Sequence, residues 1–140
     1  MTQRSKTFLY FAWLVSFVAT LGSLYFSEVL HFPPCTLCWY QRIAIYPIPL
    51  LLGYAILRQQ SAVAHSLLLI LIPGWFISLY HNLLYYHIIA DTYAPCSTGV
   101  SCTTQFVQYF GFITIPLLSF LATTAIILNI LVAKHYEQRR

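Results

Sequence analysis

Residues 34–42 have the sequence Pro34-Cys35-Thr36-Leu37-Cys38-Trp39-Tyr40-Gln41-Arg42, and an apolar run over residues 39–57 overlaps the end of this stretch. The run is about as long as the ~20 residues that a helix needs to cross ~30 Å of hydrocarbon. Proline suits the first position of a helix, because the N–H that it lacks would be unsatisfied there. We therefore expect a membrane helix that carries both cysteines of a CxxC motif in its first turn.

Three other apolar runs of similar length lie at residues 8–26, 66–86 and 111–132. In lipid only helices and closed barrels satisfy the backbone, and none of the four runs shows the period-2 alternation of a barrel strand. Prolines at positions 47, 49, 73 and 116 do not argue against helices, because membrane helices tolerate proline as a kink. The predicted fold is all-α: one integral membrane domain over residues 1–140, arranged as a four-helix bundle.

Composition indicates that lipid surrounds most of the chain. Hydrophobic residues make up 59% and charged residues 7%, whereas soluble globular domains average about 45–50% apolar and about 25% charged residues. The net charge of +4 comes mostly from Lys and Arg residues that lie between or beyond the apolar runs. A nucleic-acid-binding face would gather such residues on one element. We therefore expect membrane lipid, and no nucleic acid, as a partner.

The Lys and Arg residues also predict the orientation. Cytoplasmic loops are enriched in Lys and Arg, and these residues occur at both termini and, as Arg58, between the second and third runs. Both termini are therefore predicted to be cytoplasmic and the segments at about 27–38 and 87–110 exoplasmic, in a multi-pass protein of the cell membrane. These two segments contain Glu28 and Asp91 but no Lys or Arg. Aromatic residues, which gather at membrane interfaces, stand at the expected outer boundary: Trp39, Tyr40, Tyr85 and Tyr86.

The run at residues 8–26 also has one feature of a cleaved signal peptide, since Arg4 and Lys6 precede it. Its apolar part is longer than the usual stretch of about 7–15 residues, and no clear small-x-small cleavage site follows it. We favour a retained span. Both alternatives deliver residues 30–36 to the outer side.

All four cysteines, Cys35, Cys38, Cys96 and Cys102, fall in the two exoplasmic segments. Disulfides form and persist outside the cytosol, so this placement predicts disulfide chemistry. A helix start favours an anion through its dipole and free N–H groups, which lowers the pKa of a thiol there. The second pair closes a short ring that would stabilise the fold by only ~2 kcal/mol. That is a weak reason for a purely structural disulfide.

Two ionisable residues within the apolar runs are further candidates. Arg42 lies four residues after Cys38 and shares its helix face, and an arginine at the centre of a span costs at least about 2.5 kcal/mol. It could stabilise the Cys38 thiolate, a reduced quinone oxygen, or both, although its side chain could also only extend to the interface. His81 is expected either to form an interhelical hydrogen bond or to bind a quinone carbonyl.

The four cysteines could also serve structural disulfides, a zinc site or haem attachment. Two inert structural disulfides would suit an exoplasmic location. A zinc site of four cysteines is disfavoured, because the second pair has five intervening residues where zinc pairs usually have about two to four. Attachment of a c-type haem is excluded, because Trp39 stands where a histidine would follow the CxxC motif.

With these residues in place, the sequence resembles the DsbB family of disulfide bond formation proteins, which are thiol:quinone oxidoreductases, and within it the short BdbC type. The resemblance covers nearly the whole chain, in family order. The matching pieces are residues 34–42, Ser78-Leu79-Tyr80-His81, the Cys96/Cys102 pair and Gly111-Phe112-Ile113-Thr114-Ile115-Pro116. The cysteine-arginine stretch is the specific one, and the others support it.

The resemblance implies an electron relay. A DsbA-type thiol oxidase of the thioredoxin fold would give two electrons to the Cys96–Cys102 disulfide, with Cys96 forming the mixed disulfide and Cys102 pairing transiently with Cys35. The electrons would pass to Cys35–Cys38 and then to a quinone, either ubiquinone or menaquinone, beside Cys38 and Arg42. The better-known long members of the family separate their second pair by a much longer loop, so the step between the two pairs is open for this short form.

Two other functions fit parts of the sequence. A non-catalytic tetraspan scaffold with two structural disulfides would give no reason for Arg42 beside a CxxC motif. A quinone reductase of the vitamin-K-epoxide-reductase type would normally carry its CxxC motif on a later helix than the second.

Overall fold

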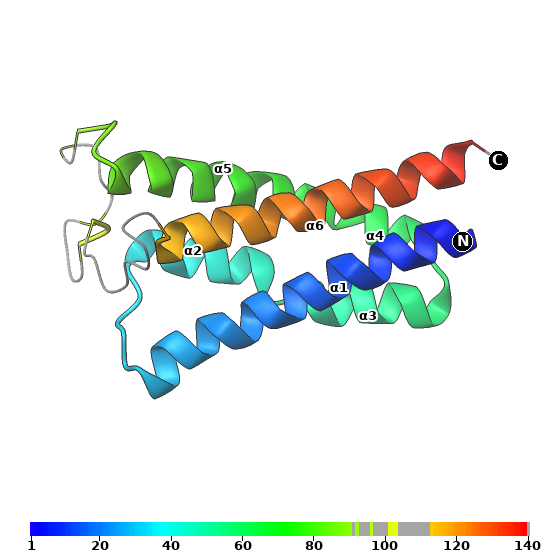
Figure 1. Cartoon of the computed structure of the whole chain (residues 1–140), viewed down its shortest axis with the longest axis horizontal. Helices are drawn as coiled ribbons and strands as arrows, with labels where there is room; N and C mark the ends of the chain where they lie inside the picture. The colour runs from blue at the N-terminus through cyan, green and yellow to red at the C-terminus, as the bar shows by residue number, and fades with distance from the viewer. Residues whose placement is uncertain (91, 93–95, 97–100, 104–112, 140) are drawn as a thin grey trace.

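The computed structural model describes residues 1–90, 92, 96, 101–103 and 113–139. These residues are mainly helical, which confirms the all-α class, and the long helices run along one axis (Figure 1). Both termini lie at one end, and the start of α2 lies at the other (Figure 1). In chain order the elements are α1 (Gln3–Leu24), the π-helix η1 (Tyr25–Val29), α2 (Thr36–Ile45), α3 (Ile48–Arg58), α4 (Ser61–Ser66), α5 (Leu68–Tyr85) and α6 (Ile115–Gln138).

Three helical stretches in the described part of the chain are long and apolar enough to cross a membrane: Gln3–Val29, Ser61–Tyr85 and Ile115–Gln138. They correspond to the first, third and fourth predicted spans, but each extends beyond the predicted bounds on the side of the termini. The prediction that proline does not end a membrane helix is confirmed at Pro73, which lies inside α5. The first two predicted residues of the fourth span, 111 and 112, lie outside the described residues.

The prediction of one continuous helix over residues 39–57 is wrong. That segment is divided into α2, with 10 residues, and α3, with 11 residues, and each is shorter than the ~20 residues of a full span. The α2 hydrogen-bond ladder ends where the N–H of Tyr46 donates to the carbonyl of Arg42. Pro47 and Pro49 follow, and neither has an N–H to continue the ladder. The two helices follow one another along the long axis of the molecule (Figure 1).

The two helices of the divided segment, α2 and α3, pack against different neighbours. α1 packs mainly on α6 and α3, whereas α5 packs on α6 and α2. The indole N–H of Trp13 donates to the carbonyl of Pro49 at 2.9 Å and so ties α1 to α3, while the indole N–H of Trp75 donates to Thr124 Oγ1 at 2.8 Å and ties α5 to α6. Such bonds hold helices together in lipid, where apolar surface alone gives little preference for another helix.

The buried residues form two clusters at different ends of the bundle. One is wholly apolar and includes Leu9, Leu52 and Ile126, from α1, α3 and α6. The other surrounds the cysteines and includes Leu37 and Leu84, from α2 and α5. The apolar cluster joins the helices toward the end that holds the termini, so the opposite end is the part of the fold that carries the reactive groups.

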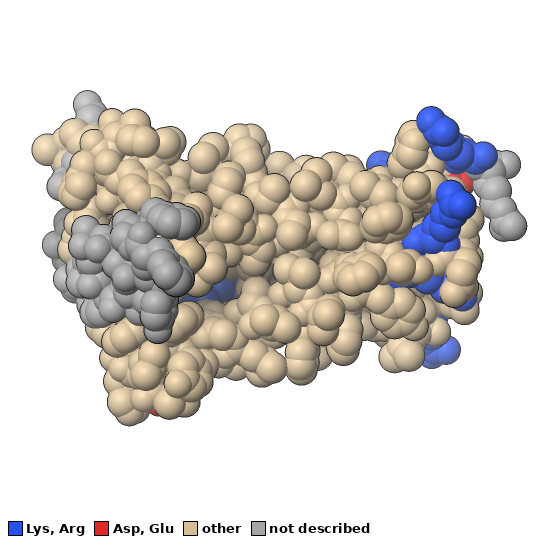
Figure 2. Space-filling model, viewed as in Figure 1, with Lys and Arg blue, Asp and Glu red and all other residues tan. Residues whose placement is uncertain are grey.

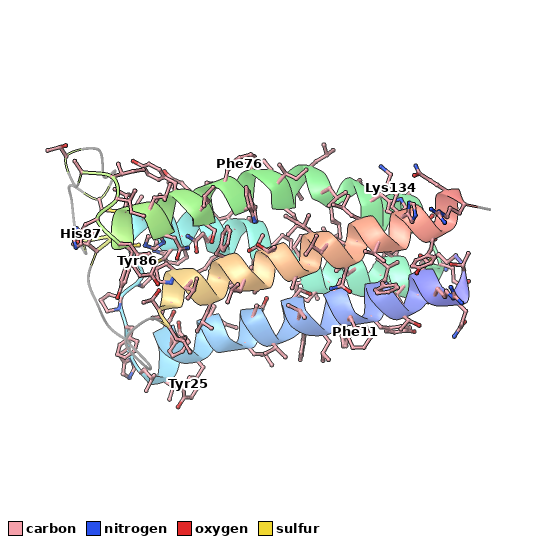
Figure 3. The ribbon with its side chains drawn as sticks, turned by 45° about the horizontal axis from the view of Figure 1, so that its top comes forward. Phe11, Tyr25, Phe76, Tyr86, His87 and Lys134 are labelled. Carbon is pink, nitrogen blue, oxygen red and sulfur yellow. A yellow bond between two sulfur atoms is a disulfide. The ribbon has the colours of Figure 1, made fainter. Side chains whose placement is uncertain are left out.

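The outer surface suits lipid along the sides and water at the ends. Phe11 and Phe76 project from opposite sides of the bundle (Figure 3) and are 55% and 59% exposed. Most of the Lys and Arg on the visible face gather at the end where the termini lie (Figure 2), and Lys134 is at this end in Figure 3. Tyr86 lies at the opposite end (Figure 3).

Of the aromatic residues predicted for the outer boundary, Trp39, Tyr40 and Tyr86 are exposed, but Tyr85 is buried. Tyr85 therefore does not present its ring to the surroundings as the other three do. Neighbouring positions on a helix point in different directions, so Tyr85 faces into the protein while Tyr86 faces out.

Candidate active site

Cys35 is the N-cap residue of α2 and not part of its first turn. Its backbone is extended, with φ −75° and ψ 172°, and its sulfur accepts a hydrogen bond from the N–H of Cys38 at 3.3 Å. Pro34 therefore precedes the cap and does not occupy the first helical position, as the sequence had suggested. Cys38 lies in the first turn, as predicted. An N-cap sulfur satisfies one of the free N–H groups of the helix start and is best suited to that task as an anion.

The structure brings the two cysteine pairs together. Cys96 and Cys102 form a disulfide, with Cα atoms 5.8 Å apart, whereas Cys35 and Cys38 are free thiols whose sulfurs lie 2.9 Å apart. The sulfur of Cys35 lies within 4.8 Å of both sulfurs of the disulfide. Cys35 therefore lies beside both its CxxC partner and the second pair, an arrangement that suits thiol–disulfide exchange.

Electrostatics favour a thiolate at Cys35, just before the first residue of α2. The hydrogen bond from the Cys38 thiol holds the pKa of the Cys35 thiol well below its ordinary value, and His81 lowers this pKa further, while burial opposes both effects. The sulfur of Cys35 lies 3.8 Å from Nε2 of His81. A low pKa makes a cysteine both a better thiolate and a better leaving group in exchange.

His81 is buried between α2, α5 and the second cysteine pair. Its Nδ1 lies 2.9 Å from Nε2 of Gln41, and its Nε2 lies 3.2 Å from the carbonyl oxygen of Cys102. The predicted interhelical hydrogen bond of His81 is thus confirmed, with Gln41 as the partner. The sequence reasoning did not single out Gln41, although a polar side chain in one apolar helix is a signal that another helix supplies its partner.

Arg42 contacts the end of α1 and a neighbouring ring. Its Nη2 donates to the carbonyl of Ser23 at 3.4 Å, and its guanidinium lies 5.5 Å from the centre of the Trp39 ring. These contacts leave part of the guanidinium facing a cavity that Cys38 also lines. The structure therefore brings Arg42 and Cys38 to one wall, as their spacing predicted.

A cavity of about 500 Å³ lies between α1, α2 and α6 and reaches the cysteines. This volume is within the range of small-molecule sites, about 300–1,000 Å³. Its polar lining is concentrated at the cysteine end, while its apolar part extends between α1 and α6. Residues that define it include Val18, Gly22, Cys38, Arg42, Leu118 and Ala122.

The donor atoms of Cys35, Cys38 and His81 also lie within 4.8 Å of one another, a spacing that could hold a metal ion. A site of four thiolates, the zinc alternative raised by the sequence, would require Cys96 and Cys102 as thiolates as well. In the structure these two are joined as a disulfide. The arrangement as it stands is a dithiol beside a disulfide, and exchange between the two is the chemistry it can perform.

Comparison with known proteins places this arrangement in a family. The family model described as "Disulfide bond formation protein DsbB" matches residues 5–133, which include all four cysteines. The chain belongs to the DsbB family. Membership confirms the resemblance seen in the sequence and indicates an oxidoreductase activity in disulfide bond formation. Together with the three long apolar helices, it indicates a membrane protein.

Relatives with the same type of name match most of the chain. "Disulfide bond formation protein C" of Bacillus subtilis (strain 168) is 46% identical over 121 residues, which cover 86% of this chain and 88% of the relative. "Probable disulfide formation protein C" of Halalkalibacterium halodurans is 42% identical and covers 87% of this chain and 89% of its own length. "Probable disulfide formation protein" of Coxiella burnetii (strain CbuK_Q154) is 44% identical over 82% of this chain and 79% of the relative. No solved structure was found to match.

Proposed function

We propose that this DsbB-family protein is a thiol:quinone oxidoreductase. It reoxidises an exported DsbA-type thiol oxidase of the thioredoxin fold and passes the electrons to a membrane quinone, ubiquinone or menaquinone. The observation that carries the proposal is the position of the CxxC pair: the Cys96–Cys102 disulfide lies within 4.8 Å of Cys35, and a largely apolar cavity begins at Cys38. One pair thus has an exchange partner on one side and room for an acceptor on the other.

The proposed topology has four spans, with α2 and α3 together forming the second. Both termini and the α3–α4 turn are cytoplasmic, and all four cysteines are exoplasmic in the cell membrane. The concentration of Lys and Arg at the end of the bundle with the termini supports this orientation (Figure 2). It also gives the cysteines access to an exported partner, in a compartment where disulfides persist.

The first step is exchange between the partner and the second pair. A thiolate of the reduced partner attacks Cys96, the partner–Cys96 bond forms, and Cys102 leaves as a thiolate. The second partner thiolate then attacks the partner's half of the mixed disulfide, which releases the oxidised partner and leaves Cys96 and Cys102 reduced. Burial supports Cys96 as the attacked sulfur, because Cys102 is only 3% exposed and Cys96 is half-buried.

The second step moves the same two electrons to the CxxC pair. When Cys35 and Cys38 form a disulfide, the Cys102 thiolate attacks Cys35, and Cys38 leaves as a thiolate. Cys96 then attacks Cys102 and displaces Cys35, so the outer disulfide is restored and the CxxC pair holds two electrons. The low pKa of Cys35 supports its role as the group displaced in this last exchange.

The cavity supports quinone as the acceptor. A quinone accepts two electrons and two protons, and its tail is apolar. The residues that would hold it are Cys38 and Arg42 at the polar end, with apolar side chains of α1 and α6 along the rest. Arg42 would bring a fixed positive charge to the oxygens that gain electron density, which favours the reduced ring. His81, the other residue for which the sequence suggested quinone binding, lines the same cavity.

The test is quinone reduction by the purified protein. In detergent, with a reduced DsbA-type protein and a short-chain ubiquinone or menaquinone, we expect the quinone absorbance to fall at a rate set by the enzyme. Cys35→Ser and Cys96→Ser should each lower the rate to the background of the uncatalysed reaction, because each removes one pair from the relay. A tetraspan scaffold with structural disulfides predicts no enzyme-dependent loss of quinone, and near-normal turnover in either variant would support that alternative.

A further inference from the structure

The Gln41–His81 pair is the part of the site whose role the relay does not yet explain. Both side chains are buried, with exposed fractions of 8% for Gln41 and 2% for His81. They come from α2 and α5, and the imidazole reaches the backbone of Cys102 in the second cysteine segment.

The chemistry of the partners determines where the imidazole proton lies. A backbone carbonyl only accepts, so Nε2 of His81 must carry a hydrogen to bond the oxygen of Cys102. In a neutral ring Nδ1 is then an acceptor, and the amide nitrogen of Gln41 donates to it. The same Nε2–H is 3.8 Å from the sulfur of Cys35, within the range of a weak hydrogen bond to sulfur.

We infer that Gln41 is a positioning residue that fixes the tautomer of His81, and that the Nε2–H of His81 docks the second cysteine pair beside Cys35. The inference rests on the proposed relay and concerns its internal step. The N–H holds the carbonyl of Cys102, and thereby its sulfur, in place for attack on Cys35. It also faces the sulfur of Cys35 as this becomes a thiolate. No proton leaves the imidazole in this step.

The ionisable groups near His81 come from α2 and from the second cysteine pair. Those that line the cavity with it are Cys35 and Cys38 at the start of α2, Arg42 one turn further along α2, and Cys102 once the second pair is reduced. α1 and α6 contribute only apolar and hydroxyl-bearing residues to this lining.

Three variants test the inference. Gln41→Leu removes the donor and leaves the tautomer unspecified. Gln41→Glu supplies a carboxylate that only accepts, so Nδ1 must carry a hydrogen, and Nε2 has one only while the ring is doubly protonated. Gln60→Leu makes the same change as Gln41→Leu at an exposed glutamine whose side chain makes no capping bond, at the other end of the bundle.

The measurement is single-turnover exchange in the full-length protein without quinone. Protein with both pairs oxidised is mixed with one equivalent of a reduced DsbA-type protein, quenched with acid and alkylated, and the reduced cysteines are identified by mass spectrometry. We expect Gln41→Leu to slow transfer from the Cys96/Cys102 pair to the Cys35/Cys38 pair about tenfold, the effect of losing one buried hydrogen bond.

The Gln41→Glu variant gives a readout that a merely structural role would not produce. Its transfer rate should be close to that of the original protein at low pH and fall below it as the pH rises, because the ring then loses the hydrogen at Nε2. Gln60→Leu should transfer at the original rate at every pH.

Two results would overturn the inference: transfer within twofold of the original rate in Gln41→Leu, or a pH profile of Gln41→Glu parallel to that of the original protein. If Gln41→Leu does not fold, the Gln41→Glu profile decides alone. Failure of the proposed function looks different. In that case the original protein transfers electrons between its pairs normally but does not reduce quinone.

Discussion

Cys35 shows most clearly how the function depends on single atoms. Its sulfur caps α2, lies 2.9 Å from that of Cys38, and lies within 4.8 Å of both sulfurs of the second pair. The CxxC motif predicts reactive thiols at a helix start, but it does not predict which of the two is the thiolate. The sequence left open whether Arg42 stabilises a Cys38 thiolate, a reduced quinone oxygen or both, and the contacts of the structure favour the anion at Cys35.

Arg42 provides a prediction at this scale. In the quinone assay, Arg42→Gln should raise the apparent KM for quinone and lower turnover about tenfold or more, because a preorganised charge beside developing negative charge is lost. Arg42→Lys keeps the charge but loses the planar fork and should have a smaller effect. Transfer between the two cysteine pairs should barely change in either variant.

The matched control for Arg42 is Arg58→Gln, a change of the same kind in the last turn of α3 at the other end of the bundle. It should leave quinone kinetics unaltered. Unchanged quinone kinetics in Arg42→Gln as well would mean that the Arg42 side chain only extends to the interface, and the acceptor would then have to be sought elsewhere in the cavity.

The role of Gln41 could not be predicted from the sequence. The cysteines, Arg42 and His81 are identifiable because a cysteine pair or an ionisable residue in an apolar run is unusual. Gln41 stands out only in the folded protein, because the close approach of α2 and α5 places its Nε2 2.9 Å from Nδ1 of His81. No local pattern encodes that contact, since the two residues lie 40 positions apart.

At the scale of elements, the close contact between α2 and α5 rests on a glycine. A Cβ added at Gly74 would lie 2.7 Å from Cβ of Ala44, well inside van der Waals contact. Small residues at such crossings let helix backbones approach one another in membranes. The Gln41–His81 hydrogen bond lies near this crossing, on the side of the cysteines: Gln41 is one turn from Ala44 in α2, and His81 is two turns from Gly74 in α5. The spacing of the two helices therefore affects the geometry of the site.

Gly74→Ala should therefore push α2 and α5 apart, destabilise the protein by about 1–3 kcal/mol and slow transfer between the cysteine pairs. Unfolding of the purified protein in a denaturing detergent, followed by circular dichroism, measures the first effect. Gly22→Ala is the control for stability, because a Cβ there meets nothing within 4 Å. Adding Ala44→Gly to Gly74→Ala removes the clash and should restore part of the stability. A Gly74→Ala variant as stable as the original protein would show that the crossing can relax without loss.

The helices also show where pattern and structure diverge. Apolar run length located three long helices well, because the hydrocarbon thickness sets a simple requirement. It did not locate the break between α2 and α3, since the prolines at 47 and 49 were interpreted as a kink within one helix. Two prolines at this spacing remove two backbone donors, and the packing of Trp13 against Pro49 holds the divided segment in the bundle.

At the scale of the whole molecule, the proposed orientation can be tested by labelling. Single-cysteine variants that retain Cys38 or Cys96 should react, in intact cells after reduction, with a membrane-impermeant maleimide. The Lys and Arg residues at the end with the termini favour a cytoplasmic location for that end, which leaves the cysteines outside. A cysteine introduced at Gln60, in the turn between α3 and α4, should react only after the cells are opened. The reverse pattern would invert the topology and remove the access of an exported partner.

The fold class, the family and the membrane location followed from composition and motifs, because these depend on the chain as a whole. The close approach of the Cys96–Cys102 disulfide to Cys35 could not be predicted in this way. The long family members separate their second pair by a much longer loop, so the spacing of the cysteines left the transfer step between the two pairs open. The second pair lies within 4.8 Å of Cys35, where the carbonyl of Cys102 also contacts His81. The proposed relay between the pairs thus depends on the assembled bundle.

The central claim, that thiol oxidation is coupled to quinone reduction, is tested most directly by anaerobic stoichiometry. A catalytic amount of the protein is mixed with an excess of reduced DsbA-type protein and a limiting amount of quinone, and both products are measured in the same sample. Coupling predicts one partner disulfide formed for each quinone reduced, with the reaction stopping when the quinone is consumed. Partner disulfides that continue to form after the quinone is exhausted, or quinone that disappears without them, would contradict the proposed function.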